Sequence, residues 1–252
     1  MKSILFTVLL GYSFACLALY LLQRNMLYFP QKAGSVSGAQ ALSFSSGKHQ
    51  LSGWVVNPGQ PRALIYYGGN AENIVSNLDF FQTVFTHYSV YLVPYRGYGN
   101  NSGSPSEQGL YQDALALIDH IGADHSSFSL LGRSLGSGVA TYVASRREVD
   151  NLILVTPYDS IENVAKGAYW MFPISWLIKD RYASIERVQS INARTLIVAA
   201  EYDNIIPRAR TDALIDAFDS AQLKSVLIRG AGHNDISQYP QYAHSIVSWL
   251  ND

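Results

Sequence analysis

"LLGRSLGSGVAT", residues 130–141, places a serine between two glycines, after an apolar run and before a run of small residues. Gly132, Ser134 and Gly136 form the pattern G-x-S-x-G, which is weak alone because a chain of this composition matches it by chance roughly once in ten cases. The context strengthens it: a β-prone run, "FSLL", comes directly before the turn and a helix-like segment directly after it. In this setting a nucleophilic serine is held above a sheet on a tight, strained turn. The alternative is a serine in an ordinary tight turn.

Short β-prone runs and helix-like segments alternate along most of the chain. The runs that predict strands are residues 41–46, 50–56, 63–69, 89–95, 128–131, 151–155, 195–200 and 225–229. The segments that predict helices are residues 73–87, 107–122 (with Ser106 as N-cap), 136–147, 209–218 and 242–250. Strands separated by helices imply right-handed crossovers and a largely parallel sheet covered on both faces. We therefore predict an α/β fold whose ligand site lies at the carboxyl ends of the strands.

A serine hydroxyl needs a neighbouring base, normally an imidazole that is itself oriented by a carboxylate. Of the six histidines, His233 lies in a glycine-rich loop after the last predicted strand, at the same edge of the sheet as Ser134. Asp203 follows the penultimate strand, so the order is serine, acid, histidine, as in one well-known arrangement of this triad. A solvated loop histidine is the alternative for His233.

Two other carboxyl groups compete with Asp203 for the role of the acid. Glu201 is nearer to the strand end, and Asp159 follows the strand that comes after the serine's helix. Asp203 has the better loop context, and Asp235 is too close to His233 in sequence to orient it easily.

A tetrahedral intermediate also needs backbone N–H donors for its oxyanion. The amide of Leu135, directly after the serine and at a helix N-terminus, is the first candidate. The second is the amide of Asn70, in the loop "YYGGNAEN" after the third predicted strand, where Gly68 and Gly69 allow close approach of the main chain. The alternative is a glycine-rich turn without this role.

The N-terminal stretch "SILFTVLLGYSFACLALYLL", residues 3–22, is uncharged and about as long as a membrane-crossing helix. Signal-peptide cores are shorter and precede a small-residue cleavage site, so we expect an uncleaved single-pass anchor, with a removed signal as the alternative. Lys2 stands on one side of the stretch, and Arg24 and Lys32 stand on the other. We favour a cytoplasmic N-terminus with the domain on the outer side.

The expected organisation is an anchor over residues 1–24, a connector over 25–40 and a catalytic domain over 41–252, with a cap segment over 158–190. The cap contains the most aromatic stretch of the chain: Tyr169, Trp170, Met171, Phe172, Trp176 and Leu177. Such residues predict either an apolar acyl-chain pocket that dips into the headgroup layer or a helix with its aromatics packed in the core.

The composition excludes several classes of function. A net charge of −1 without dense runs of Lys and Arg gives no footprint for nucleic acid. The single cysteine, Cys16, excludes a disulfide within the chain and zinc sites built on several thiolates.

Four segments resemble the α/β-hydrolase superfamily: residues 95–114 ("YRGYGNNSGSPSEQGLYQDA"), 132–140 ("GRSLGSGVA"), 201–207 ("EYDNIIP") and 230–235 ("GAGHND"). They most resemble its membrane-anchored serine hydrolase branch, which includes lysophospholipases and protein depalmitoylases. The resemblance implies an α/β-hydrolase fold over nearly the whole chain beyond the anchor. It also implies Ser134 as nucleophile, Asp203 as acid, His233 as base, and Leu135 and Asn70 at the oxyanion hole.

The chain departs from the pattern of these enzymes at two places. It has Gly68-Gly69 where they usually have His-Gly, and Pro94 where an acidic residue often precedes "YRG". Arg96 of that motif is expected to tie down its loop rather than to act in catalysis.

The predicted function is a membrane-anchored serine hydrolase that cleaves carboxylic esters or thioesters, with a lipid-like acyl substrate. The chemistry requires neither a metal nor an organic cofactor. Two alternatives stay open. One is a serine peptidase of the same fold, with Glu72, Glu162 or Arg208 to bind a charged peptide end. The other is a non-catalytic hydrolase-like binding protein, because fold does not fix function.

Overall fold

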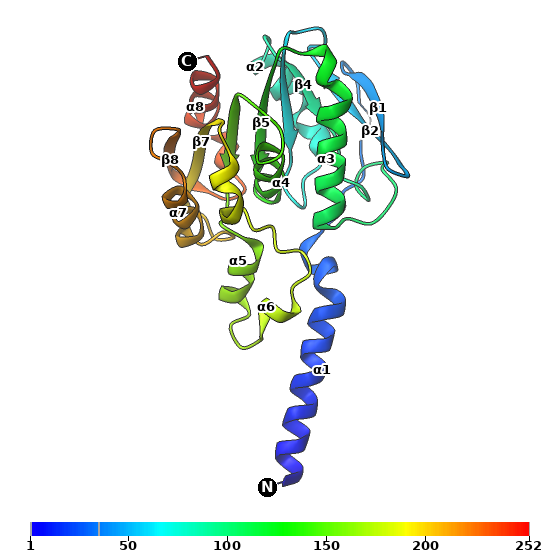
Figure 1. The fold of residues 1–252 in the computed structure, drawn as a ribbon, viewed down its shortest axis with the longest axis vertical. Helices are drawn as coiled ribbons and strands as arrows, with labels where there is room; N and C mark the ends of the chain where they lie inside the picture. The colour runs from blue at the N-terminus through cyan, green and yellow to red at the C-terminus, as the bar shows by residue number, and fades with distance from the viewer. Residues whose placement is uncertain (1, 35, 252) are drawn as a thin grey trace.

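The computed structural model describes residues 2–34 and 36–251. Within this part of the chain, eight strands form one sheet in the order β1-β2-β4-β3-β5-β6-β7-β8 (Figure 1). The strands are β1 Gln40–Ser46, β2 His49–Val56, β3 Arg62–Tyr67, β4 Ser89–Leu92, β5 Ser127–Arg133, β6 Asn151–Val155, β7 Arg194–Tyr202 and β8 Leu223–Gly232. β2 pairs antiparallel with β1 and β4, and the other pairs are parallel. The predicted mostly parallel sheet is confirmed.

Helices cover both faces of the sheet, as predicted. The α-helices of the described residues are α1 Lys2–Leu27, α2 Leu78–Val84, α3 Glu107–Ile121, α4 Leu135–Ala144, α5 Ile161–Ala168, α6 Ile174–Leu177, α7 Arg208–Ala217 and α8 Pro240–Asn251. α3, α4 and α7 contribute to the core on one face, and α2 and α8 contribute to the core on the other. Successive strand residues serve opposite faces: in β3, Ala63 and Ile65 belong to the first core, and Leu64 and Tyr66 to the second.

Local signals explain how individual elements begin and end. Ser106 caps α3 by accepting a hydrogen bond from the Gly109 amide, as expected. The segment predicted as one helix over 73–87 is a short 3-10 helix, Ile74–Asn77, followed by α2, and Asn73 caps its start.

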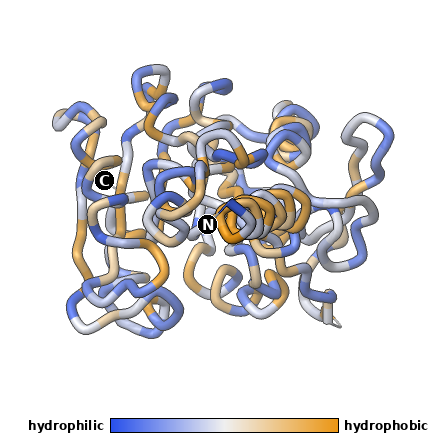
Figure 2. Tube along the Cα trace, turned by 90° about the horizontal axis from the view of Figure 1, so that it is seen from below, coloured by the Kyte–Doolittle hydropathy of each residue, from blue (hydrophilic) through white to orange (hydrophobic). Residues whose placement is uncertain are grey.

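α1 is a straight apolar helix that projects from the domain (Figure 1), and Figure 2 shows it end on, predominantly hydrophobic. Among the described residues it is the one helix long and apolar enough to cross a membrane. It continues to Leu27, three residues beyond the expected anchor, and Tyr28 directly after it is buried in the domain. The phenol of Tyr28 lies 2.8 Å from the phenol of Tyr182, so the end of α1 is part of the folded structure.

The cap segment contains α5 and α6, which lie beside α1 at the end of the domain from which α1 projects (Figure 1). Glu162 of α5 accepts hydrogen bonds from Lys166 and Arg181, which join α5 to the chain that returns after α6. These bonds, that of Lys166 first, outweigh the effect of burial and lower the pKa of Glu162 to about 2. The side chains of Trp170 and Trp176 are 78% and 86% exposed. The alternative in which these aromatics pack in the core is therefore wrong.

Candidate active site

Ser134 stands alone between the end of β5 and the start of α4, with φ 51° and ψ −118°. A positive φ is unfavourable for a residue with a β-carbon and persists only where surrounding structure enforces it. The Ser134 amide donates to the carbonyl of Val155 at the end of β6, and the Ser134 carbonyl accepts from the amide of Ser137. The sheet and the helix thus hold the serine in the strained turn that the sequence predicts.

The two glycines of the motif are required by close backbone contacts. A β-carbon at Gly132 would collide with the carbonyl of Gly136, and one at Gly136 would collide with the carbonyl of Tyr67 in β3. Strand and helix can therefore approach this closely only where both positions lack a side chain.

The structure brings Ser134, His233 and Asp203 together in one line of hydrogen bonds. His233 Nε2 lies 2.9 Å from Ser134 Oγ, and His233 Nδ1 lies 2.8 Å from Asp203 Oδ2. The imidazole is 5% exposed and sits directly after β8, as Asp203 does after β7. The other carboxylate oxygen of Asp203 accepts from the amides of Ile205 and Ile206, which fixes its orientation. With Nδ1–H donating to the carboxylate, Nε2 is free to accept the serine proton.

The competing carboxylates are used elsewhere. Glu201 accepts from a backbone amide in β8, and Asp159 is buried in contact with Asn163 and Arg210. Asp235 accepts from the backbone amide that precedes His233. Asp203 is the one of the four that is bonded to the imidazole in the described part of the chain.

Both expected oxyanion donors border the same cavity as Ser134. Leu135 is the first residue of α4, and Asn70 lies in the loop after β3. A β-carbon at Gly69 would stand 3.9 Å from that of Ser134, so this loop passes directly beside the serine. The carbonyl of Asn70 accepts from the amide of Phe29, and its side-chain amide donates to the carbonyl of Leu27. The end of α1 therefore positions this loop.

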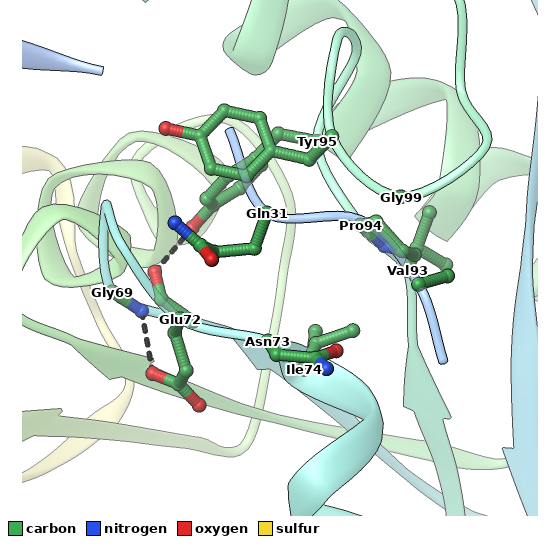
Figure 3. Close-up of a pocket in the computed structure, with 12 residues that line it drawn as sticks. Gln31, Gly69, Glu72, Asn73, Ile74, Val93, Pro94, Tyr95 and Gly99 are labelled. Atoms are coloured by element: carbon green, nitrogen blue, oxygen red, sulfur yellow. Dashed lines mark hydrogen bonds between the residues drawn. The ribbon is translucent and has the colours of Figure 1, made fainter. Parts of the chain in front are cut away.

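A mostly buried carboxylate, that of Glu72 with 11% of its side chain exposed, stabilises the loop that contains Gly68 and Gly69. One oxygen accepts from the Gly69 amide at 2.8 Å (Figure 3) and from Arg133 at 3.1 Å. The other accepts from the hydroxyl of Tyr66 at 2.6 Å and from the side-chain amide of Asn77. From the sequence, Glu72 was a candidate only for binding a charged peptide end, and no local pattern indicated this positioning role.

The loop that contains Arg96 supports the same region from the other side. Arg96 forms a buried bidentate ion pair with Asp113 of α3, which agrees with the structural role expected for it. The loop directs two phenols at the glycine-rich turn: Tyr95 donates to the carbonyl of Gly68 at 2.7 Å, and Tyr98 donates to that of Asn70 at 2.6 Å.

The electrostatics of these groups keep the phenols in their donor form. Burial, followed by the nearby charge of Glu72, raises the pKa of Tyr66 and of Tyr95 well above the ordinary value. Burial opposes the charge of Arg133, but the Glu72 carboxylate helps to outweigh it, and the pKa of the guanidinium is raised. The carboxylate of Glu72 therefore accepts hydrogen bonds from the neutral phenol of Tyr66 and from the charged guanidinium of Arg133.

A cavity of about 780 Å³ opens at Ser134 and His233. Its polar end also contains Asn70, Arg133 and Asn234. Most of its remaining wall is apolar and comes from the cap and α1: Ile161, Val164, Ala165, Ala168, Tyr169, Ile174, Leu177 and Ile178, with Leu19, Met26 and Leu27. Phe29, Ile205 and Ile206 add further apolar surface, and Gln23 and Asp180 are polar members of the wall. In the described residues, no cluster of three or more His, Cys, Asp or Glu side chains could hold a metal ion.

Comparisons with known proteins agree with this architecture. The chain is 33% identical over 232 residues to an uncharacterized protein of Mycobacterium tuberculosis, which covers 84% of this chain and 81% of that one. It is 29% identical over 203 residues to the alpha/beta hydrolase domain-containing protein 17C of Xenopus laevis, and the match covers 77% of this chain and 63% of that protein. An esterase from Pyrococcus furiosus has a similar structure, with a TM-score of 0.73 and 14% sequence identity. The superposition covers 89% of this chain and 96% of the esterase. No family model matches the chain.

Proposed function

We propose that this chain, which has an α/β-hydrolase fold, is a serine hydrolase that cleaves carboxylic esters or thioesters through Ser134, His233 and Asp203. One observation carries this proposal: a strained serine, an imidazole and a fixed carboxylate stand in hydrogen-bonded line at the polar end of a large apolar cavity.

The geometry accounts for each step of acyl transfer. Ser134 Oγ attacks the carbonyl carbon while His233 Nε2 takes its proton, and Asp203 stabilises the imidazolium. The oxyanion accepts hydrogen bonds from the amides of Leu135 and Asn70. His233 then returns the proton to the leaving alkoxide or thiolate, which leaves an acyl group on Ser134. A water molecule, deprotonated by His233, releases the acid and restores the serine.

The cavity favours an acyl group as the part of the substrate that is bound. Its volume of about 780 Å³ lies in the range of small-molecule sites, and aliphatic side chains form most of its wall away from Ser134. An acyl chain would remove that surface from water without leaving a polar group unpaired.

The charges considered for a peptidase are engaged in other contacts. Glu72 is bonded to the oxyanion loop and to Arg133, Glu162 to Arg181, and Arg208 to Asp212 of its own helix. This supports an ester or thioester over a peptide with a charged end.

The test is labelling of the full-length protein in membranes with a fluorophosphonate probe. We expect the wild type to be labelled, Ser134→Ala to be unlabelled, and Ser145→Ala to be labelled as the wild type is. Ser145 is a suitable control because its hydroxyl donates to the Tyr142 carbonyl at the far end of α4. A folded wild type that takes no label would refute the proposal and favour the binding protein.

A further inference from the structure

The N-terminal half of α1 is joined to the tip of the cap. The rings of Tyr12 and Phe172 stack with centroids 5.6 Å apart, and the Tyr12 hydroxyl donates to the carbonyl of Met171 at 2.8 Å. Tyr12 and Met171 are 159 positions apart in the sequence. The contacts place the cap tip at the depth of Tyr12 along α1.

The C-terminal half of α1 is joined to the base of the cap. The side chain of Gln23 donates to the carbonyl of Leu177 at 2.9 Å and accepts from the amide of Lys179 at 2.7 Å. Arg24 forms two hydrogen bonds with Asp180, whose side chain is only 4% exposed. Removal of the helix as a signal would take away the cation of this buried carboxylate and leave it the backbone amide of Glu107 as a donor, so the contacts favour a retained helix.

The positions of the charges on α1 give the depth of the cap in a bilayer. Lys2 and Arg24 are about 33 Å apart along a helix, which is close to the thickness of a bilayer's hydrocarbon core. Tyr12 is about 18 Å from Arg24 on the same scale. The cap tip, which contacts Tyr12, then lies in the hydrocarbon region and not at the headgroups.

The composition of the cap fits that depth. Residues 169–178, "YWMFPISWLI", contain no charged side chain. Trp170, Met171 and Trp176 are largely exposed, which is costly in water and favourable against lipid chains. Lys179 comes directly after this stretch and stacks over the ring of Tyr20, within one helical turn of Arg24.

The cavity extends from the reacting serine into the same region. Leu19, Gln23, Met26 and Leu27, all on one face of α1, form one wall, and α5 and α6 form the wall opposite. From Leu27 to Leu19 the cavity follows α1 for about 12 Å towards the cap tip.

We propose that α1 is part of the substrate site as well as an anchor, and that the substrate is an acyl lipid of the bilayer whose chain enters between α1 and the cap. The inference rests on the proposed function. The chain leaves the hydrocarbon region without crossing water, and its ester or thioester carbonyl reaches Ser134 at the level where Arg24 and Asp180 mark the membrane surface. The α1 wall then selects for chain length.

The depth of the cap is tested with the full-length protein in phosphatidylcholine vesicles whose acyl chains carry bromine at mid-depth. Bromine quenches tryptophan fluorescence only at close contact. Four tryptophans are present, and Trp54 and Trp249 belong to the domain. We expect strong quenching of the wild type, and little quenching of a double variant with Trp170→Phe and Trp176→Phe. Equal, weak quenching of both proteins would overturn the inference.

The role of the α1 wall is tested by the ratio of kcat/KM for dodecanoyl and butanoyl p-nitrophenyl esters. Leu19→Trp fills the cavity, and Leu21→Trp is the matched control because Leu21 is 63% exposed and faces away from the cap. Each methylene that cannot be buried lowers the ratio about fourfold, so exclusion of three lowers it about sixtyfold. If Leu19→Trp does not fold, Leu19→Phe is measured in its place. This smaller change should give a smaller decrease in the ratio of kcat/KM.

The outcomes separate the two proposals. If neither ester is hydrolysed and the probe does not label the protein, the hydrolase function itself is refuted. Hydrolysis with the same chain-length ratio in the wild type, Leu19→Trp, Leu19→Phe and Leu21→Trp would leave the hydrolase intact and overturn the role of α1.

Discussion

Glu72→Gln tests whether the mostly buried carboxylate of Glu72 holds the loop that contains Gly69 and Asn70. Each carboxylate oxygen accepts from two donors: Tyr66 and Asn77 on one, and Gly69 and Arg133 on the other. A glutamine has one acceptor oxygen, so its NH₂ group must face one of these pairs. It is best placed towards Tyr66 and Asn77, because a hydroxyl can turn to accept and an asparagine amide can flip.

Even in that arrangement the negative charge is lost beside Arg133. Removal of one partner of a buried ion pair costs about 3–5 kcal/mol. The side chain of Arg133 is 17% exposed and also donates to the carbonyl of His233, so we expect the lower end, about 3 kcal/mol. For a chain of this length that corresponds to a decrease in Tm of about 6–12 °C.

The effect on catalysis follows from the Gly69 amide. Its hydrogen bond to a charged acceptor becomes one to a neutral acceptor, which is weaker by about 1 kcal/mol. The loop keeps its bonds from Tyr95 and Tyr98, so we expect kcat to fall about fivefold, less than for loss of an oxyanion donor.

Tm and kcat on a short soluble ester are measured side by side for Glu72→Gln and for Glu201→Gln. Glu201 also accepts a hydrogen bond from a backbone amide, that of Gly230, but at an exposed position away from Arg133. Its variant should behave as the wild type does. If Glu72→Gln also changed neither Tm nor kcat, the carboxylate would not hold the loop.

Three further predictions concern the acid, the serine turn and the cap. Asp203→Asn should lower kcat about 10⁴-fold, while Asp235→Asn, assayed on the same ester, should retain most activity because its carboxylate binds only a backbone amide. Gly136→Ala should prevent folding as judged by circular dichroism, whereas Gly167→Ala, in a helix with no atom within 4 Å of the new β-carbon, should be as stable as the wild type or more so. The Glu162 carboxyl, with its pKa lowered from 4.5 to about 2, contributes stability above pH 4.5 that is lost as the pH falls towards 2. The difference in Tm between the wild type and Glu162→Gln should therefore shrink over that range, and a constant difference would contradict the assignment.

The proximity of Ser134, His233 and Asp203 could be predicted from the sequence because local signals and one topological rule suffice for it. Gly132 and Gly136 mark a close approach of strand and helix, and parallel strands bring their carboxyl ends to one edge. Ser134, Asp203 and His233 each follow a strand, so their meeting in space requires only that β5, β7 and β8 belong to the same sheet.

The supports of these three residues could not be predicted in the same way. Glu72 gathers donors from β3, the oxyanion loop, the start of α2 and the end of β5, and no short pattern encodes such a set. The pair Arg24–Asp180 joins residues 156 positions apart. Aromatic content alone left the cap between two interpretations, because an apolar stretch reads the same in a protein core and in a bilayer.

These supports connect α1 to the hydrogen-bonded group of Ser134, His233 and Asp203. The last turn of α1 binds the side chain of Asn70 through the Leu27 carbonyl, and the Phe29 amide binds its carbonyl. Asn70 is therefore fixed between α1 and Ser134, and the position of its amide depends on the last turn of α1. The same face of α1 lines the cavity at Leu19 and Met26. In the proposed site, a lipid chain that packs against α1 would contact the element that positions the loop of Asn70, so binding of the chain and placement of the carbonyl would be physically coupled through one helix.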